Sequence, residues 1–278
     1  MFFICQQLAE NRALRRIKGE LPMGKTIAIV NQKGGVGKTT SCVNLAAALT
    51  AQGAKVLVCD FDPQGNATSG FGLDKTRSPS VYDVILGGAP MSRAVVPTKW
   101  ADVAPANKAL SGATVELIGL DRREYRLRDA LDEVKDKYDF IFIDCPPSLE
   151  LLTLDGLCAA DTLLVPVQCE YYALEGLSDL LYTVRLAKQR LNPTLELEGV
   201  VLTMYDGRTN LSLQVAEEVK RHFPGKVYAS VIPRNVRLSE APSHGVPVSV
   251  YDPLSRGAEA YDLLAKEFLR KNPVPVKK

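Results

Sequence analysis

The segment KGGVGKTT, residues 33–40, constrains the fold of this chain more than any other feature of its sequence. It follows the apolar run TIAIV and precedes SCVNLAAALTAQG, an apolar segment of helical character that ends at Gly53. Glycines at such a strand-to-helix turn let backbone N–H groups curve around phosphate oxygens, and the helix N-terminus adds a favourable dipole. Lys38 would neutralise the β- and γ-phosphates of a nucleotide, and Thr39 would offer its hydroxyl to Mg²⁺. The segment therefore predicts a nucleotide-binding loop.

The loop departs from the strict P-loop pattern at its first position. That pattern requires glycine five residues before Gly37, where this chain has Gln32. The chain has instead a second lysine, Lys33, at the front of a K-G-G-x-G-K-T run. Average residue frequencies give such a run a chance occurrence of about one in ten thousand. A glycine turn with incidental lysines is therefore the weaker interpretation.

Apolar, β-rich runs alternate with helical patterns along most of the chain. This order predicts one doubly wound α/β domain, with a mostly parallel sheet and helices on both faces. The predicted strands are 25–31, 54–60, 114–119, 138–144, 161–167, 197–203 and 226–232. The predicted helices are 38–52, 121–136, 150–159, 174–191, 210–223 and 255–271. Residues 70–113 are rich in Gly, Pro and Ser, and predict irregular surface with a short helix near 80–87.

The predicted domain covers residues 23–271, between an extension (1–22) and a loose tail (272–278). Residues 1–22 either lie upstream of a true start at Met23 or include a short basic helix around 5–19. The composition, 46% hydrophobic and 24% charged, is that of a globular protein with a sizeable core. A net charge of +2 means that any nucleic-acid surface must be local.

Other residue classes point to no additional chemistry. No apolar run reaches eighteen residues, so no membrane span is predicted. The six cysteines form no CxxC pair and are expected to be free thiols in a reducing cytosol. The two histidines, His222 and His244, lie far apart in sequence and are given no role.

Three aspartates end predicted strands at the carboxyl edge of the sheet, where doubly wound folds bind their ligands. Asp60 and Asp62 follow strand 54–60, and Asp144 closes the run YDFIFID. A carboxylate after strand 54–60 can orient an attacking water or hold a magnesium-bound water; capping of the next turn is the structural alternative. Asp144 has the position of a Walker B carboxylate, which holds Mg²⁺ through water.

The KGGVGKTT loop resembles the deviant Walker A motif of the family that includes ParA, Soj and MinD. The resemblance runs from Met23 to about Arg270 and is strongest to the ParA/Soj branch of DNA-partitioning ATPases. It continues through VLVCDFDPQGNATSG (56–70), FIFIDCPPS (140–148), VPVQCEYYALEGL (165–177), VLTMYDGRTNLS (201–212) and VIPRNVRLSEAPSHG (231–245). A chromosomal and a plasmid system remain equally open.

The resemblance implies an ATPase that uses ATP and Mg²⁺. The residues expected to contact the nucleotide in the loop are Lys33, Gly34, Gly35, Val36, Gly37, Lys38, Thr39 and Thr40. Lys33, Lys38 and Asp62 are implied to be catalytic, with Asp62 positioning the water. Thr39, Asp60 and Asp144 are implied to belong to the metal site. Met204, Pro233 and Asn235 are implied to contact the base, although a Met at a strand end is equally compatible with core packing.

The resemblance also implies that ATP drives dimerisation. Lys33 would cross to the nucleotide of a second subunit, where its charge would stabilise phosphoryl transfer; a solvated loop lysine is the alternative. The dimer would bind double-stranded DNA non-specifically, and a ParB-type centromere-binding partner would stimulate hydrolysis and release. The protein would then be cytoplasmic and nucleoid-associated.

The DNA contacts are predicted from local charge. Arg208 in YDGRTN and Arg237 in IPRNVR come from loops expected after neighbouring strands, and a dimer would pair them into a basic strip. Such a strip would contact phosphates without reading bases. Scattered surface arginines are the alternative.

Three other functions compete with partitioning. A MinD-like membrane ATPase needs an amphipathic lipid-binding helix at its C-terminus, and here the last helix stops in NPVPVKK. An iron–sulfur relative needs paired cysteines that Cys145 and Cys158 do not reproduce. An ATP-gated DNA-binding regulator, in which hydrolysis is incidental, remains open.

Overall fold

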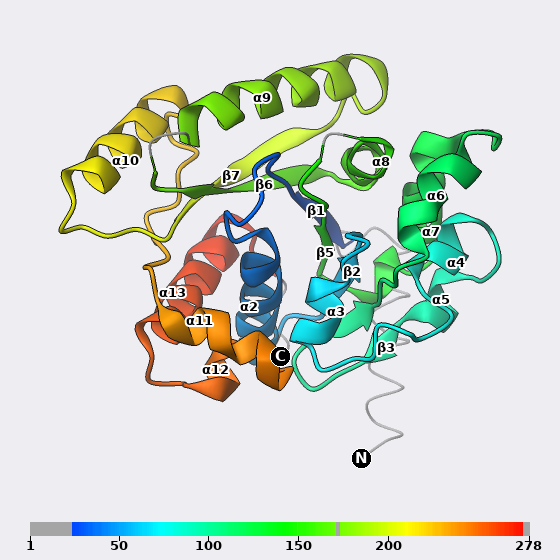
Figure 1. Ribbon diagram of the computed structural model, residues 1–278, viewed down its shortest axis with the longest axis horizontal. Coiled ribbons are helices and arrows are strands. Elements are labelled where there is room, and N and C mark those ends of the chain that lie inside the picture. Colours follow the sequence, from blue (N-terminus) through cyan, green and yellow to red (C-terminus); the bar gives the residue numbers. More distant parts are fainter. Residues whose placement is uncertain (1–23, 149, 171–172, 275–278) are drawn as a thin grey trace.

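The computed structural model describes residues 24–148, 150–170 and 173–274, and gives no side-chain description for 173–179. A seven-stranded sheet in the order β3-β4-β2-β5-β1-β6-β7 runs through the centre of the molecule (Figure 1). The strands are β1 (Lys25–Ile29), β2 (Val56–Asp60), β3 (Val96–Pro97), β4 (Asp102–Ala104), β5 (Phe140–Asp144), β6 (Thr162–Gln168) and β7 (Glu196–Thr203). All neighbours pair in parallel except β3 and β4, which pair antiparallel. The predicted doubly wound, mostly parallel fold is confirmed.

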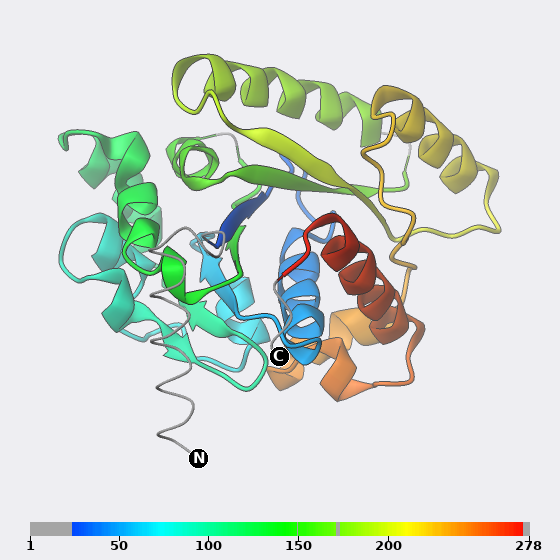
Figure 2. The ribbon, with the colours of Figure 1, turned by 180° about the vertical axis from the view of Figure 1, so that it is seen from behind.

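Helices cover both faces of this sheet (Figures 1 and 2). One face carries α2 (Lys38–Ala51) and α13 (Arg256–Lys271), with the short elements α3 (Asn66–Gly70), α11 (Val236–Glu240), η3 (Ala241–His244) and α12 (Val248–Tyr251) beside them. The other face carries α4 (Val81–Ile85), α5 (Met91–Ala94), α6 (Leu110–Leu117), η1 (Arg123–Tyr125), α7 (Arg126–Asp132), η2 (Lys135–Lys137), α8 (Leu151–Ala159), α9 (Ala173–Arg190) and α10 (Asn210–His222).

The strand residues alternate between two apolar cores because successive side chains of a strand point to opposite faces. Ile27 and Ile29 of β1 belong to the core under α2 and α13, whereas Ala28 belongs to the core on the other face. All five residues of β2 and of β5 are buried. Continuous apolar strands therefore have the physical cause that the sequence suggested, which is cover on both faces.

The predicted strand at 114–119 is wrong, because this segment belongs to α6. Its buried residues are Leu110, Ala113 and Leu117, at helical spacing, while Val115 is 73% exposed. The local alternation of TVELIG suggested a strand, but the longer helical period determines the fold. The sheet is completed instead by β3 and β4, which lie inside the region predicted to be irregular.

The segment 226–232 is also not a regular strand. It runs beside β7 and makes isolated parallel bridges at Val227 and Pro233. The N–H groups of Ala229 and Ser230 donate to the carboxylate of Glu267 on α13, both at 2.9 Å. Because these donors are used by a side chain, the ladder is interrupted. The predicted helix 121–136 is likewise divided into η1, α7 and η2, whereas the short helix near 80–87 is confirmed as α4.

Gly199 provides a test of the packing between β7 and this outer segment. A Cβ at Gly199 would lie 2.5 Å from a ring carbon of the buried Tyr228 and 2.8 Å from the Lys226 carbonyl oxygen. We expect Gly199→Ala to lower the free energy of unfolding by about 1–3 kcal/mol, because the backbone oxygen cannot move away cheaply. Urea denaturation measures the change. Gly119→Ala is the matched control, since that site is open; equal stability of the two variants would contradict the prediction.

Candidate functional site

The glycine loop joins β1 to α2 at the carboxyl edge of the sheet. Gly35 has a φ of +73° and Gly37 a φ of +90°, a left-handed conformation that L side chains rarely adopt. Gly37 is the N-cap of α2, and no side chain among the described residues caps this helix. Successive loop amides of this kind, followed by a helix N-terminus, form an anion-binding concavity.

Lys38 follows the glycine loop and is the first residue of α2. It is 7% exposed, and its Nζ donates to the Lys33 carbonyl oxygen across the loop at 2.9 Å. Burial lowers the pKa of Lys38, while the nearby Asp144, Cys145 and Asp62 act in the opposite direction. The ammonium group therefore lies between the loop backbone and the acidic strand ends.

Asp144 has the least satisfied side chain at this edge. Both of its carboxylate oxygens are buried without a hydrogen bond of good geometry among the described residues, although the Thr39 hydroxyl lies near enough to lower its pKa. Burial is the main cause that raises the pKa of Asp144 well above its usual value, and Asp60 is the second. A buried carboxylate without donors calls for a cation.

Asp60 faces Asp144 in the register of β2 and β5. Its carboxylate accepts from the N–H and the hydroxyl of Thr68 at 2.7 and 2.6 Å, and from the N–H of Asp62 at 3.3 Å. Burial raises the pKa of Asp60 to about 6, against the effect of these hydrogen bonds. The structure thus gives Asp60 a role in holding the chain after β2, which is the structural alternative that the sequence left open. Its place in the metal site stays a prediction.

These residues fit Mg²⁺. The ion binds through one or two carboxylates together with substrate phosphates and waters. Asp144 offers two oxygens that lack donors, and Thr39 lies beside it on the first turn of α2. Among the described residues no three His, Cys, Asp or Glu side chains form a group that could hold a metal ion by themselves.

Asp62 lies in the turn between β2 and α3. It is 7% exposed, and its Oδ1 accepts from the N–H of Gln64 at 2.9 Å. Its charge raises the pKa of both Lys38 and Asp144. One of its oxygens is thereby oriented by the backbone, and the rest of the carboxylate stays available to a water.

The three residues predicted to contact the base line one cavity. This cavity has a volume of about 260 Å³. It is lined by Gly37, Thr40, Thr203, Met204, Ile232, Pro233, Arg234, Asn235, Leu238, Ser239, Pro242 and Tyr261. It therefore begins at the glycine loop and extends between the end of β7 and α11. Its position and its mixture of apolar walls with a few polar groups suit a purine.

Met204 and Asn235 hold specific conformations at this cavity. Met204 has a φ of +50°, which is uncommon for a residue with a side chain and is typical of functional sites. Asn235 caps α11, because its Oδ1 accepts from the N–H of Arg237 at 3.0 Å. The amide nitrogen of Asn235 is the half of the side chain that remains to donate to a ligand.

Lys33 is half-buried at the front of the loop. Its N–H donates to Oδ1 of Asn31 at 3.0 Å, and its carbonyl oxygen accepts from Lys38. The sequence prediction concerned the Lys33 side chain and missed Asn31 and Thr203, which hold the loop. Each is a polar residue at the carboxyl end of an apolar strand, the same signal that identified the aspartates.

The predicted DNA-contacting arginines are each ion-paired. Arg208 lies in the loop after β7, as expected, whereas Arg237 lies on α11 and not in a loop. Arg208 is 2.7 Å from Asp206, and Arg237 is 2.8 Å from Glu240 and 3.2 Å from Asp252. The loop after β7 adjoins the segment before α11, because the Tyr205 N–H donates to the Ile232 carbonyl and the Arg234 N–H to the Tyr205 carbonyl.

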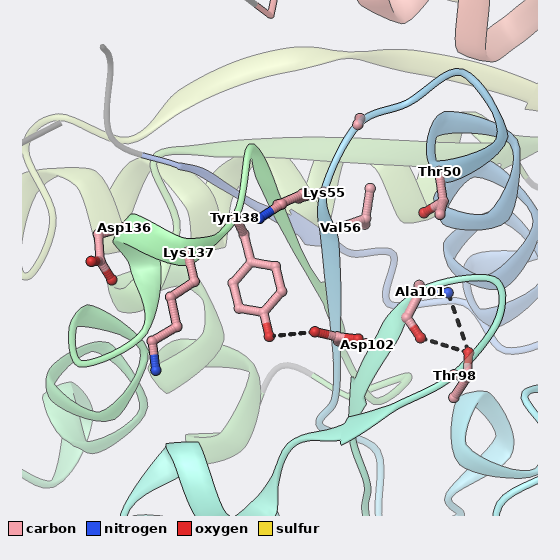
Figure 3. Close-up of a pocket in the computed structure, with 10 residues that line it drawn as sticks. Thr50, Lys55, Val56, Thr98, Ala101, Asp102, Asp136, Lys137 and Tyr138 are labelled. Atoms are coloured by element: carbon pink, nitrogen blue, oxygen red, sulfur yellow. Dashed lines mark hydrogen bonds between the residues drawn. The ribbon is translucent and has the colours of Figure 1, made fainter. Parts of the chain in front are cut away.

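A larger cavity lies elsewhere and contains none of the predicted site residues. It has a volume of about 420 Å³ and opens near the amino ends of β2, β4 and β5, where Tyr138 donates to Asp102 at 2.8 Å (Figure 3). The glycine loop and the strand-end aspartates lie at the opposite edge of the sheet. The volume of a cavity therefore does not identify the nucleotide site here, whereas the chemistry of the lining side chains does. Within the three ranges that the structure describes, no helix is both long and apolar enough to span a membrane.

Comparisons with known proteins show what this chain is similar to. A family model described as an AAA domain matches residues 24–197. The chain is 59% identical over 248 residues to the sporulation initiation inhibitor protein Soj of Bacillus subtilis, covering 88% of this chain and 98% of that protein. It is 50% identical over 258 residues to the chromosome partitioning protein ParA of Myxococcus xanthus, covering 92% and 91%.

A solved structure is similar at the level of the fold and the sequence. Cobyrinic acid a,c-diamide synthase from Mycobacterium smegmatis, with bound ATP analog and magnesium, superimposes with a TM-score of 0.80 at 40% identity, covering 89% of this chain and 94% of that one. The loop, the strand-end aspartates and the identity to Soj and ParA lead to one conclusion. The chain belongs to the ParA/Soj family of chromosome-partitioning ATPases.

Proposed function

We propose that this chain is a DNA-partitioning switch in which Mg²⁺–ATP brings two subunits together on DNA and hydrolysis releases them. The observation that carries the proposal is the buried carboxylate of Asp144, which among the described residues lacks a hydrogen bond of good geometry and lies near Lys38 at the glycine loop. The 59% identity to Soj exceeds the 40% identity to the diamide synthase, which favours partitioning over the synthase activity.

Residues of one subunit would bind the triphosphate. Amides of Gly34–Lys38 donate to the phosphate oxygens, and Lys38 exchanges the Lys33 carbonyl for the β- and γ-phosphates. Thr39 and Asp144 hold Mg²⁺, which neutralises charge on the phosphates when bound. Met204, Pro233 and Asn235 contact the base in the 260 Å³ cavity.

Hydrolysis would require a positioned water. Asp62 orients this water toward the γ-phosphate, with its own carboxylate fixed by the Gln64 N–H. In phosphoryl transfer, positioning and electrostatic stabilisation supply most of the catalysis. Lys33 of the second subunit adds positive charge at the phosphates, which couples dimerisation to turnover.

DNA binding would use Arg208 in the loop after β7 and Arg237 on the adjoining α11. Their present partners, Asp206 for Arg208 and Glu240 and Asp252 for Arg237, lie on the surface, where each ion pair contributes about 0–1 kcal/mol. DNA phosphates can therefore displace these carboxylates at little cost. A ParB-type partner would stimulate hydrolysis, and we place the protein in the cytoplasm on the nucleoid.

The experiment that tests the proposal compares DNA binding with ATP, with ADP and without nucleotide, at two salt concentrations. Fluorescence anisotropy of a labelled duplex is expected to rise only with ATP, and binding is expected to fall steeply at the higher salt. Equal binding in all three nucleotide states would contradict the switch.

We expect the double variant Arg208→Ala with Arg237→Ala to weaken ATP-dependent DNA binding about tenfold or more, independently of base sequence. The slope of log affinity against log salt should become shallower by about 0.9 for each phosphate that the variant no longer neutralises. Arg128→Ala is the matched control, since Arg128 is an exposed arginine on α7, away from Arg208 and Arg237. If the double variant bound DNA as tightly as the control, neither arginine would contact DNA.

A further inference from the structure

Asn31 occupies a position from which it can fix the geometry of Lys33. It lies two residues after the end of β1 and is 6% exposed. Its Nδ2 donates to the Pro166 carbonyl oxygen of β6 at 2.8 Å, and its Oδ1 accepts from the Lys33 N–H at 3.0 Å. One buried amide thus ties the front of the glycine loop to the sheet.

The connection reaches the second lysine of the loop as well. The Lys33 carbonyl oxygen accepts from Nζ of Lys38 at 2.9 Å. In the proposed bound state Lys38 leaves this carbonyl for the phosphates, so that the Lys33 carbonyl oxygen loses this hydrogen bond. The hydrogen bond from the Lys33 N–H to Oδ1 of Asn31 then remains to hold the Lys33 backbone in place.

The geometry points to Asn31 as a positioning residue that sets the direction in which Lys33 is presented to a second subunit. This inference rests on the proposed role of Lys33 and adds a residue for which neither the motif nor the comparisons give a function. The physical argument is that a long, flexible lysine can reach a neighbouring nucleotide reproducibly only if its backbone is fixed. A shift of about 1 Å at such a group can cost on the order of a hundredfold in rate.

Thr203 offers a comparison within the same loop. Its Oγ1 donates to the Val36 carbonyl oxygen at 2.8 Å, from the end of β7. Thr203→Val removes this hydrogen bond with little change in shape and does not touch the Lys33 peptide. Asn31→Ala and Thr203→Val therefore loosen the same loop at different peptides.

A double-mutant cycle tests the inference. We expect Asn31→Ala to lower the kcat of ATP hydrolysis, measured in the presence of DNA, about tenfold to a hundredfold with a small change in KM. In a Lys33→Ala background, Asn31→Ala should lower kcat no further, whereas Thr203→Val should act in both backgrounds. An equal effect of Asn31→Ala with and without Lys33 would overturn the inference. If Lys33→Ala alone left dimerisation and turnover intact, the proposed dimer mechanism would fail instead.

A measurement on the unaltered protein keeps the test independent of how well Asn31→Ala folds. In the nucleotide-free protein, amide hydrogen exchange at Lys33 should be slower than at the exposed Gly34, because the Lys33 N–H is bonded to a buried oxygen. Exchange at Lys33 as fast as at Gly34 would also overturn the inference.

Discussion

Asp62→Ala is expected to lower the rate of ATP hydrolysis by about 10²- to 10⁴-fold, the usual contribution of a group that positions or deprotonates a nucleophile. ATP binding should persist, because Lys38, the loop amides and Asp144 are unchanged. The variant should therefore accumulate in the ATP state and stay on DNA after the wild-type protein has dissociated.

Phosphate release and the dissociation of labelled DNA, measured on the same sample, check this prediction. Asp74→Ala is the control, since Asp74 is exposed and accepts from Thr76 in the next loop. If Asp62→Ala left both rates at the control values, Asp62 would not act on the water and hydrolysis would not govern release.

Lys38→Ala is expected to weaken ATP binding by about 2–5 kcal/mol, the range for removing one partner of a buried charge pair. The loss is large because Lys38 is 7% exposed and lies among Asp144 and Asp62, so its charge is poorly screened. Calorimetric titration with a non-hydrolysable ATP analogue measures the change.

Two other lysines define what is specific to Lys38. Lys266→Ala changes an exposed lysine paired with Asp262 on α13 and should bind the analogue as the wild type does. Lys33→Ala should also bind it, since Lys33 is proposed to act on the nucleotide of the other subunit. Near-equal affinity of Lys38→Ala and Lys266→Ala would show that the loop does not bind the phosphates.

The sequence predicted the parts of the site that depend on local pattern. Lys38 and Thr39 begin α2, and Asp60 and Asp144 end neighbouring strands in register, because a parallel sheet places such residues at one edge. The sequence did not predict that the Asp60 carboxylate accepts hydrogen bonds from Thr68, while that of Asp144 has no hydrogen bond of good geometry among the described residues. That difference depends on the fold of the chain after β2, which brings the N–H and the hydroxyl of Thr68 to the Asp60 carboxylate.

The rest of the fold was harder for a similar reason. TVELIG alternates like a strand, and only contact with α4 and the underlying core distinguishes the helix. The segment 226–232 forms no regular strand, because two of its N–H groups donate to Glu267, a residue distant in sequence. The cavity that joins Met204, Pro233 and Asn235 follows from long-range packing between β7 and α11, and the sequence pointed to it only through the family resemblance.

The central claim is that ATP joins two subunits through Lys33. Light scattering coupled to size-exclusion chromatography, with Asp62→Ala to prevent turnover, measures this directly. With saturating Mg²⁺–ATP the mass should rise from that of one chain, 30.3 kDa, to that of two. It should remain at one chain when Lys33→Ala is added. A single-chain mass for the Asp62→Ala protein with ATP, or a dimer that forms equally well without Lys33, would contradict the account.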